Sequence, residues 1–135
     1  MRAVDFIENP VTGERIAFAT STPELLVMHA VWPRPGHRTL EHVHPSMEER
    51  FTATTGTVAV RIGGRELMLA EGESATAPAG VRHVAWNPSS GVVEVRLEMR
   101  PACRWEEFTR RLFAGEDPRA LLREYEQEVL IPPAA

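Results

Sequence analysis

The strongest constraint on the fold is a series of short apolar and β-branched runs, separated by turn-forming clusters, between residue 15 and about residue 100. Runs of this length with breaks rich in glycine and proline are typical of strands in a compact antiparallel sandwich or barrel. Gly63 and Gly64 separate two of the runs and are predicted to close a two-residue hairpin. The clearest strands are predicted over residues 16–20, 25–32, 57–62, 66–70 and 92–99.

After Pro101 the apolar spacing changes from that of strands to that of helices. Trp105, Phe108 and Leu112 form one stripe, and a second helix is predicted to begin after Asp117 and to end at the prolines at 132 and 133. The chain is therefore divided into a strand domain, residues 1–100, and a helical extension, residues 101–135. We expect the extension to pack on the barrel or on a partner subunit and to carry no chemistry.

The composition excludes several classes of function. The net charge is −4 and the basic residues form no stripe, so we expect no nucleic-acid partner. All 15 basic side chains are arginines, which excludes lysine-dependent Schiff-base chemistry. The longest apolar run, residues 25–32, is far shorter than the roughly 18 residues of a membrane helix. The first residues also include acids where a secretory signal needs an apolar stretch, so we expect a cytoplasmic protein without a membrane partner.

The strand predicted over residues 25–32 has apolar residues on both faces. One face carries Leu26, Met28, Ala30 and Trp32, and the other carries Leu25, Val27 and Val31. A single small domain offers no second layer for that other face. We therefore expect a homodimer with this sheet at or near the contact.

Four of the five histidines lie between residues 37 and 83, and His42 and His44 are two residues apart. In a strand, residues at this spacing project from one face about 6.6 Å apart, so two imidazoles can lean onto one ion. Glu48 and Glu49 follow a predicted turn, and either carboxylate could face the pair from the next strand. His83 follows a Pro-Ala-Gly turn and is placed to be a third imidazole.

These stretches resemble the two paired motifs of the cupin superfamily. The first motif is Gly36, five residues, His42-Val43-His44, four residues, Glu49, six residues and Gly56. The second is Gly72, five residues, Pro78-Ala79-Gly80, two residues, His83, three residues and Asn87. The motifs cover residues 36–87, and every specified position is occupied.

The resemblance implies an all-β, jelly-roll β-barrel, here followed by two short C-terminal α-helices, that holds one divalent transition metal ion. It implies that the metal ligands are His42, His44, Glu49 and His83, with Glu48 as the second candidate for the carboxylate. We do not expect His29 or His37 to be ligands. Three imidazoles and one carboxylate suit iron, nickel, manganese, zinc, copper or cobalt, and the sequence does not choose between them. An octahedral ion would keep two open positions, which favours a catalytic ion.

Side chains on the same inward faces as the ligands should line the cavity, and Met28, Trp32 and Phe51 are the predicted substrate-binding residues. The substrate expected from them is a small, largely apolar organic molecule with one or two chelating oxygens. Three function classes fit. They are a dioxygenase, a Lewis-acid isomerase, cyclase or decarboxylase, and a protein that binds a ligand without converting it. We prefer the dioxygenase because no dedicated proton-transfer residue stands out beyond the metal ligands. Glu48 would supply a general base if it pointed inward.

Overall fold

The computed structural model describes residues 6–34 and 40–133. Within them the strands are β1 (Phe6–Glu8), β2 (Arg15–Ser21), β3 (Leu26–Trp32), β4 (Glu48–Thr55), β5 (Val58–Ile62), β6 (Arg65–Leu69), β7 (Ser74–Ala77), β8 (His83–Trp86) and β9 (Val93–Arg100). Two helices follow, α1 (Trp105–Phe113) and α2 (Pro118–Glu124). The five clearest predicted strands are all present, with ends that differ by at most one residue. The structure adds β1 and β7, places Glu48 and Glu49 on the strand that follows the predicted turn, β4, and begins β8 at His83.

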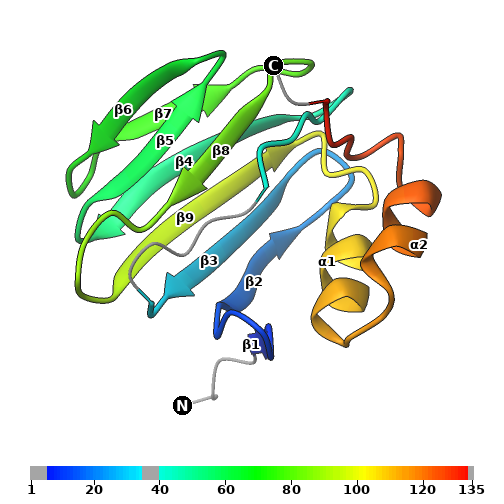
Figure 1. Cartoon of the computed structure of the whole chain (residues 1–135), viewed down its shortest axis with the longest axis horizontal. Coiled ribbons are helices and arrows are strands. Elements are labelled where there is room, and N and C mark those ends of the chain that lie inside the picture. The colour runs from blue at the N-terminus through cyan, green and yellow to red at the C-terminus, as the bar shows by residue number, and fades with distance from the viewer. Residues whose placement is uncertain (1–5, 35–39, 134–135) are drawn as a thin grey trace.

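The strands form two antiparallel sheets (Figure 1). One has six strands in the order β1-β2-β3-β9-β4-β7, and the other has three in the order β6-β5-β8. The all-β jelly-roll prediction is therefore confirmed. Figure 1 also shows α1 and α2 beside the β2 end of the larger sheet, away from the three-stranded sheet.

Alternation along the strands builds the core. In β4, Glu49 and Phe51 face inward and are buried, whereas Arg50 between them is exposed. The buried apolar side chains of both sheets form one cluster, and Phe113 of α1 belongs to it. One outward position departs from the pattern, because Glu98 of β9 is buried beside Arg100, whose Nη1 lies 3.3 Å from its carboxylate.

Two turns require glycine. Gly63 and Gly64 join β5 to β6 with φ values of 58° and 82°, which confirms the predicted hairpin. Gly56, between β4 and β5, has a φ of 80°, and a Cβ there would lie 2.9 Å from a methyl carbon of Val93. Any side chain at Gly56 would therefore meet both backbone strain and a clash.

The C-terminal helices differ from expectation at one end. Asp117 caps α2 as predicted, because its side chain accepts a hydrogen bond from the backbone N–H of Arg119. The prediction that α2 continues to the prolines at 132 and 133 is wrong, since the helix ends at Glu124. Tyr125 leaves the helical conformation, and the turn that follows lets Leu130 form a β-bridge with Val43. Among the described residues, neither helix has the length and apolarity needed to span a bilayer.

The outer face of β3 is better covered than predicted. Val27, on this face, is buried within the single chain, and His29 is exposed beside Arg96 of β9. Leu25 and Val31 are half-buried. The apolar surface left for a partner subunit is therefore smaller than the sequence pattern suggested.

Candidate metal centre

Two of the four predicted ligands face each other across a backbone pair. The backbone N–H of His42 donates to the carbonyl of His83 at 2.9 Å, and the N–H of His83 donates to that of His42 at 2.9 Å. Residues paired in this way project side chains to the same side, and the two imidazole centroids lie 4.5 Å apart. His83 reaches this position because β8 starts after the turn at Gly80, whose N–H donates to the carbonyl of His44.

The other two predicted ligands complete the cluster. His44 follows His42 at the spacing expected for one face, and their ring centroids lie 4.8 Å apart. Glu49 projects inward from β4, and one carboxylate oxygen lies 3.0 Å from Nε2 of His44 and 3.1 Å from Nε2 of His83. One potential ligand atom from each of the four residues lies within 4.8 Å of all the others. Glu49 is 6% exposed, and His44 and His83 are 1% exposed.

Hydrogen bonds orient all three imidazoles. In His42, Nδ1 lies 2.7 Å from the carbonyl oxygen of Leu40. Nδ1 of His44 lies 2.8 Å from the carbonyl oxygen of Glu128, and Nδ1 of His83 lies 3.0 Å from that of Val81. A carbonyl can only accept a hydrogen bond, so each Nδ1 carries a proton and donates it. Each Nε2 is then left for the centre of the cluster, as in metal-binding histidines whose other nitrogen is hydrogen-bonded.

The surroundings of the cluster shift the pKa values of its residues in different directions. Burial lowers the pKa of His42 from 6.5 to about 4, and the nearby His44 and His83 act in the same direction. Burial alone would raise the pKa of Glu49. The hydrogen bonds that Nε2 of His44 and of His83 donate to it when the imidazole is protonated outweigh burial and hold that pKa well below its usual range. Burial likewise opposes protonation of His83, yet its hydrogen bond to Glu49 raises its pKa. The carboxylate is therefore an anion ready to bind a cation.

The donor set fits a metal ion. Three Nε2 atoms and one carboxylate oxygen converge from His42, His44, His83 and Glu49, which is a combination that first-row transition metals accept. The hydrogen bonds already fix the imidazole orientations that such an ion requires.

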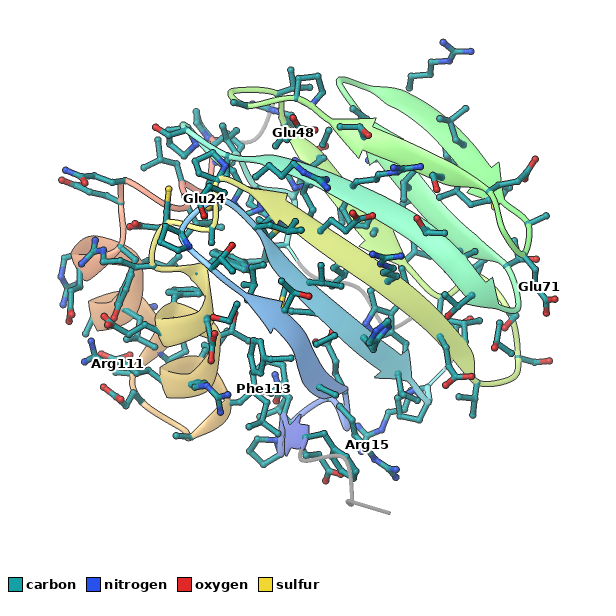
Figure 2. All side chains as sticks on the ribbon, turned by 180° about the vertical axis from the view of Figure 1, so that it is seen from behind. Arg15, Glu24, Glu48, Glu71, Arg111 and Phe113 are labelled. Carbon is teal, nitrogen blue, oxygen red and sulfur yellow. The ribbon has the colours of Figure 1, made fainter. Side chains whose placement is uncertain are left out.

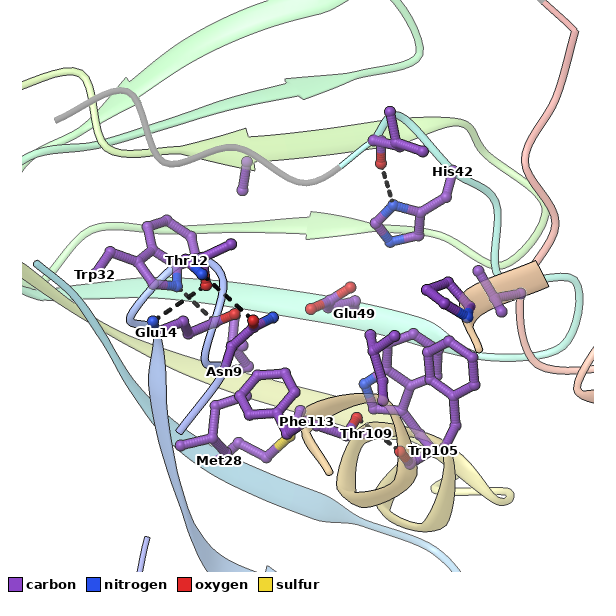
Figure 3. Close-up of a pocket in the computed structure, with 18 of the residues that line it drawn as sticks. Asn9, Thr12, Glu14, Met28, Trp32, His42, Glu49, Trp105, Thr109 and Phe113 are labelled. Atoms are coloured by element: carbon purple, nitrogen blue, oxygen red, sulfur yellow. Dashed lines mark hydrogen bonds between the residues drawn. The ribbon is translucent and has the colours of Figure 1, made fainter. Parts of the chain in front are cut away.

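A cavity of about 320 Å³ adjoins the cluster, and His42 and Glu49 form part of its wall (Figure 3). This volume is at the lower end of the range for small-molecule sites. Met28, Trp32 and Phe51, the three predicted substrate-binding residues, all line it. The other end of the cavity is polar and is lined by Asn9 and Thr12, from the loop after β1, and by Glu14. The Glu14 carboxylate accepts a hydrogen bond of 2.7 Å from Nε1 of Trp32.

The helical extension forms the remaining wall, which sequence reasoning missed. Its lining side chains include Trp105, Leu112 and Phe113 from α1 and Leu122 from α2. Figure 3 shows Phe113 beside Met28 and Trp105 farther along the same wall. The stripe at residues 105, 108 and 112 signalled a buried face, but the sequence contained no signal that this face borders a cavity.

The remaining sequence candidates lie elsewhere. Glu48 is at the start of β4 on its outward face, opposite Arg100 of β9, and is labelled in the view from behind (Figure 2). His29 is exposed on the outer face of β3. His37 and the motif residue Gly36 lie outside the described residues. Asn87, the last motif residue, is fully buried, and its side-chain amide donates to the carbonyl of Trp32 at 3.1 Å, so it joins the end of β8 to β3.

Comparison with known proteins gives one family and many similar structures. A family model described as Cupin domain matches residues 33–99. TT1209 from Thermus thermophilus is 29% identical with a TM-score of 0.60, over 69% of this chain and 87% of that one. An RmlC-like cupin from Shewanella frigidimarina NCIMB 400 is 19% identical with a TM-score of 0.67, over 76% and 88%. A sugar phosphate isomerase of the cupin superfamily from Silicibacter pomeroyi is 17% identical with a TM-score of 0.64, over 73% and 71%. A search of curated proteins found no match.

Proposed function

Because the chain belongs to the cupin superfamily, we propose that it is a metal-dependent enzyme that acts on a small, largely apolar molecule with chelating oxygens, as a dioxygenase. The observation that carries the proposal is the position of the four-residue cluster at the wall of an apolar cavity. His42, His44, His83 and Glu49 would hold the ion. A bound iron(II) ion would supply two open coordination positions, which suffice for one oxygen of the substrate and for dioxygen.

The cavity wall supports an apolar substrate. Aromatic and aliphatic side chains from β3, β4 and α1 dominate it, and no arginine is among the described residues that line it. A phosphorylated substrate would lack the cationic partners that recognise phosphate. For this reason we do not extend the activity named for the Silicibacter pomeroyi isomerase to this chain, whose 17% identity supports a shared fold alone.

The acidic residues favour dioxygenation over proton-transfer chemistry. Isomerisation or cyclisation through a polarised carbonyl needs a general base close to the substrate. Glu48, the sequence candidate for that role, lies on the outward face of β4. Among the described residues that line the cavity, the carboxylates are Glu49, a proposed ligand, and Glu14, which accepts from Trp32. Dioxygenation places both atoms of one dioxygen molecule in the substrate, so it needs neither a base of this kind nor an external reductant.

The test is oxygen consumption by the iron(II)-loaded full-length chain with a panel of catechols and enols. We expect about one dioxygen consumed per product formed, with no turnover under argon. Equal turnover under argon would show that the protein is not a dioxygenase and would instead indicate a Lewis-acid isomerase, cyclase or decarboxylase. Tight ligand binding without product in air would instead identify a binding protein.

A further inference from the structure

The C-terminal segment reaches the candidate metal centre from outside the part of the chain that matches the family model. The family match ends at residue 99, yet His44 contacts two later residues. Its Nδ1 donates to the carbonyl oxygen of Glu128 at 2.8 Å, and its ring meets the Trp105 indole edge-on with centroids 4.7 Å apart. One of the three imidazoles is therefore oriented by the helical extension and not by the barrel.

The Glu128 carbonyl lies in a turn that is fixed at both ends. On one side, the backbone N–H groups of Glu128 and Val129 donate to the carbonyl of Tyr125 at 2.8 and 3.0 Å. On the other side, Leu130 exchanges two backbone hydrogen bonds of 2.9 Å with Val43, which separates His42 from His44. The turn is thus attached directly to the His42–His44 segment.

An ion pair between the half-exposed Arg104 and the buried Glu128 holds the same turn against the start of α1. The Glu128 side chain is 4% exposed. Its carboxylate accepts from Nη2 of Arg104 at 2.9 Å, from Nε at 3.2 Å and from the backbone N–H of Arg104 at 3.3 Å. Arg104 also donates to the carbonyl of Glu124 and lies over the Tyr125 ring. These contacts fix the turn with a geometry that a planar guanidinium provides and an amide does not.

We propose that Arg104 and Glu128 are positioning residues for the metal centre, acting through the Glu128 carbonyl on His44. This proposal rests on the proposed metal-dependent function. As long as the carbonyl accepts from Nδ1, the proton stays on that atom and Nε2 faces the other ligands. Loss of the ion pair leaves the turn held by its backbone hydrogen bonds alone. The Glu128 carbonyl, the acceptor that selects the tautomer and ring orientation of His44, is then fixed less firmly.

The test compares cobalt(II) binding by the full-length chain in four forms: wild type, Arg104→Gln, Glu128→Gln and the control Glu116→Gln. Glu116 forms an ion pair with Arg111 in the same helical extension but lies away from the cavity. Circular dichroism first establishes that each variant is folded. A fifth form, Arg104→Lys, keeps the positive charge but not the planar guanidinium at this half-exposed position and provides a milder variant. The readouts are the cobalt dissociation constant and the visible absorption spectrum of the bound ion.

We expect Arg104→Gln and Glu128→Gln to weaken cobalt binding by about 10-fold or more, the range found when the partner of a ligating histidine is removed. Their cobalt spectra should differ from that of wild type, while Arg104→Lys partly restores affinity and Glu116→Gln matches wild type. Affinity and spectrum equal to the control in both Gln variants would overturn the positioning role and leave the metal centre intact. Failure of the wild type itself to bind cobalt would overturn the metal centre and this inference with it.

Discussion

Replacing Glu49 by glutamine tests which of two adjacent carboxylates serves the cluster. Glu49 is buried with one oxygen 3.0 and 3.1 Å from two imidazole nitrogens, whereas Glu48 is directed away from them on the other face of β4. Glutamine has almost the same shape but no charge. Glu49→Gln should therefore weaken metal binding, and Glu48→Gln is its matched control one residue away.

The size of the effect follows from what each residue would contribute. Loss of an outer partner of a metal ligand costs about 10- to 100-fold in affinity, so loss of a charged ligand should cost at least about 100-fold, or about 2.8 kcal/mol. With metal at about 100 times the wild-type dissociation constant, binding stabilises the wild type by about 2.7 kcal/mol. The same metal concentration would stabilise Glu49→Gln by only about 0.4 kcal/mol.

Chemical denaturation with and without metal measures this difference within each variant, so any change in the stability of the metal-free protein cancels. Glu48→Gln should keep nearly the full stabilisation of about 2.7 kcal/mol. If Glu48→Gln loses the stabilisation and Glu49→Gln retains it, the carboxylate has been wrongly assigned. If both retain it, the centre has no carboxylate ligand.

Four further outcomes are expected. His42→Ala, His44→Ala and His83→Ala should each reduce the metal bound per chain while circular dichroism remains that of a folded barrel; undiminished metal content in all three would remove these histidines from the site. Metal affinity should rise with pH through the pKa of His83, which its hydrogen bond to Glu49 raises against the effect of burial, because a proton on Nε2 must leave before an ion binds. The dependence should approach about tenfold per pH unit for each proton displaced, and a constant affinity between about pH 6 and pH 8 would contradict it. Phe113→Ala should destabilise the fold by about 3 kcal/mol in denaturant titrations and allow bulkier apolar ligands to bind; unchanged ligand selectivity would show that this ring does not limit the cavity. Sedimentation should give a homodimer, and a monomer at micromolar concentration would contradict the prediction drawn from the outer face of β3.

The sequence predicted the features that depend on local pattern. The period-two alternation located the central strands and the inward face of β4, and the glycine pair located the β5–β6 hairpin. The motif spacing selected Glu49 over Glu48, and the structure brings Glu49 together with the three histidines of the motifs. In each case neighbouring residues in the chain carry the information.

Features that depend on distant segments were missed. The apolar stripe of α1 indicated a buried face, but only the tertiary arrangement shows that this face closes the cavity next to Met28. The carbonyl of Glu128 has no sequence signature, because every residue has a carbonyl and its role comes from the turn after α2. The end of α2 at Glu124 was also missed, since the bridge between Leu130 and Val43 determines the path of the chain there.

The most direct test of the metal centre is anomalous diffraction from crystals of the full-length chain grown with cobalt or iron, recorded at the absorption edge of the metal. We predict one peak per chain within about 2.0–2.2 Å of Nε2 of His42, His44 and His83 and of a Glu49 carboxylate oxygen. The account would be contradicted by a peak bound to other residues, or by these four side chains turned apart with no peak between them.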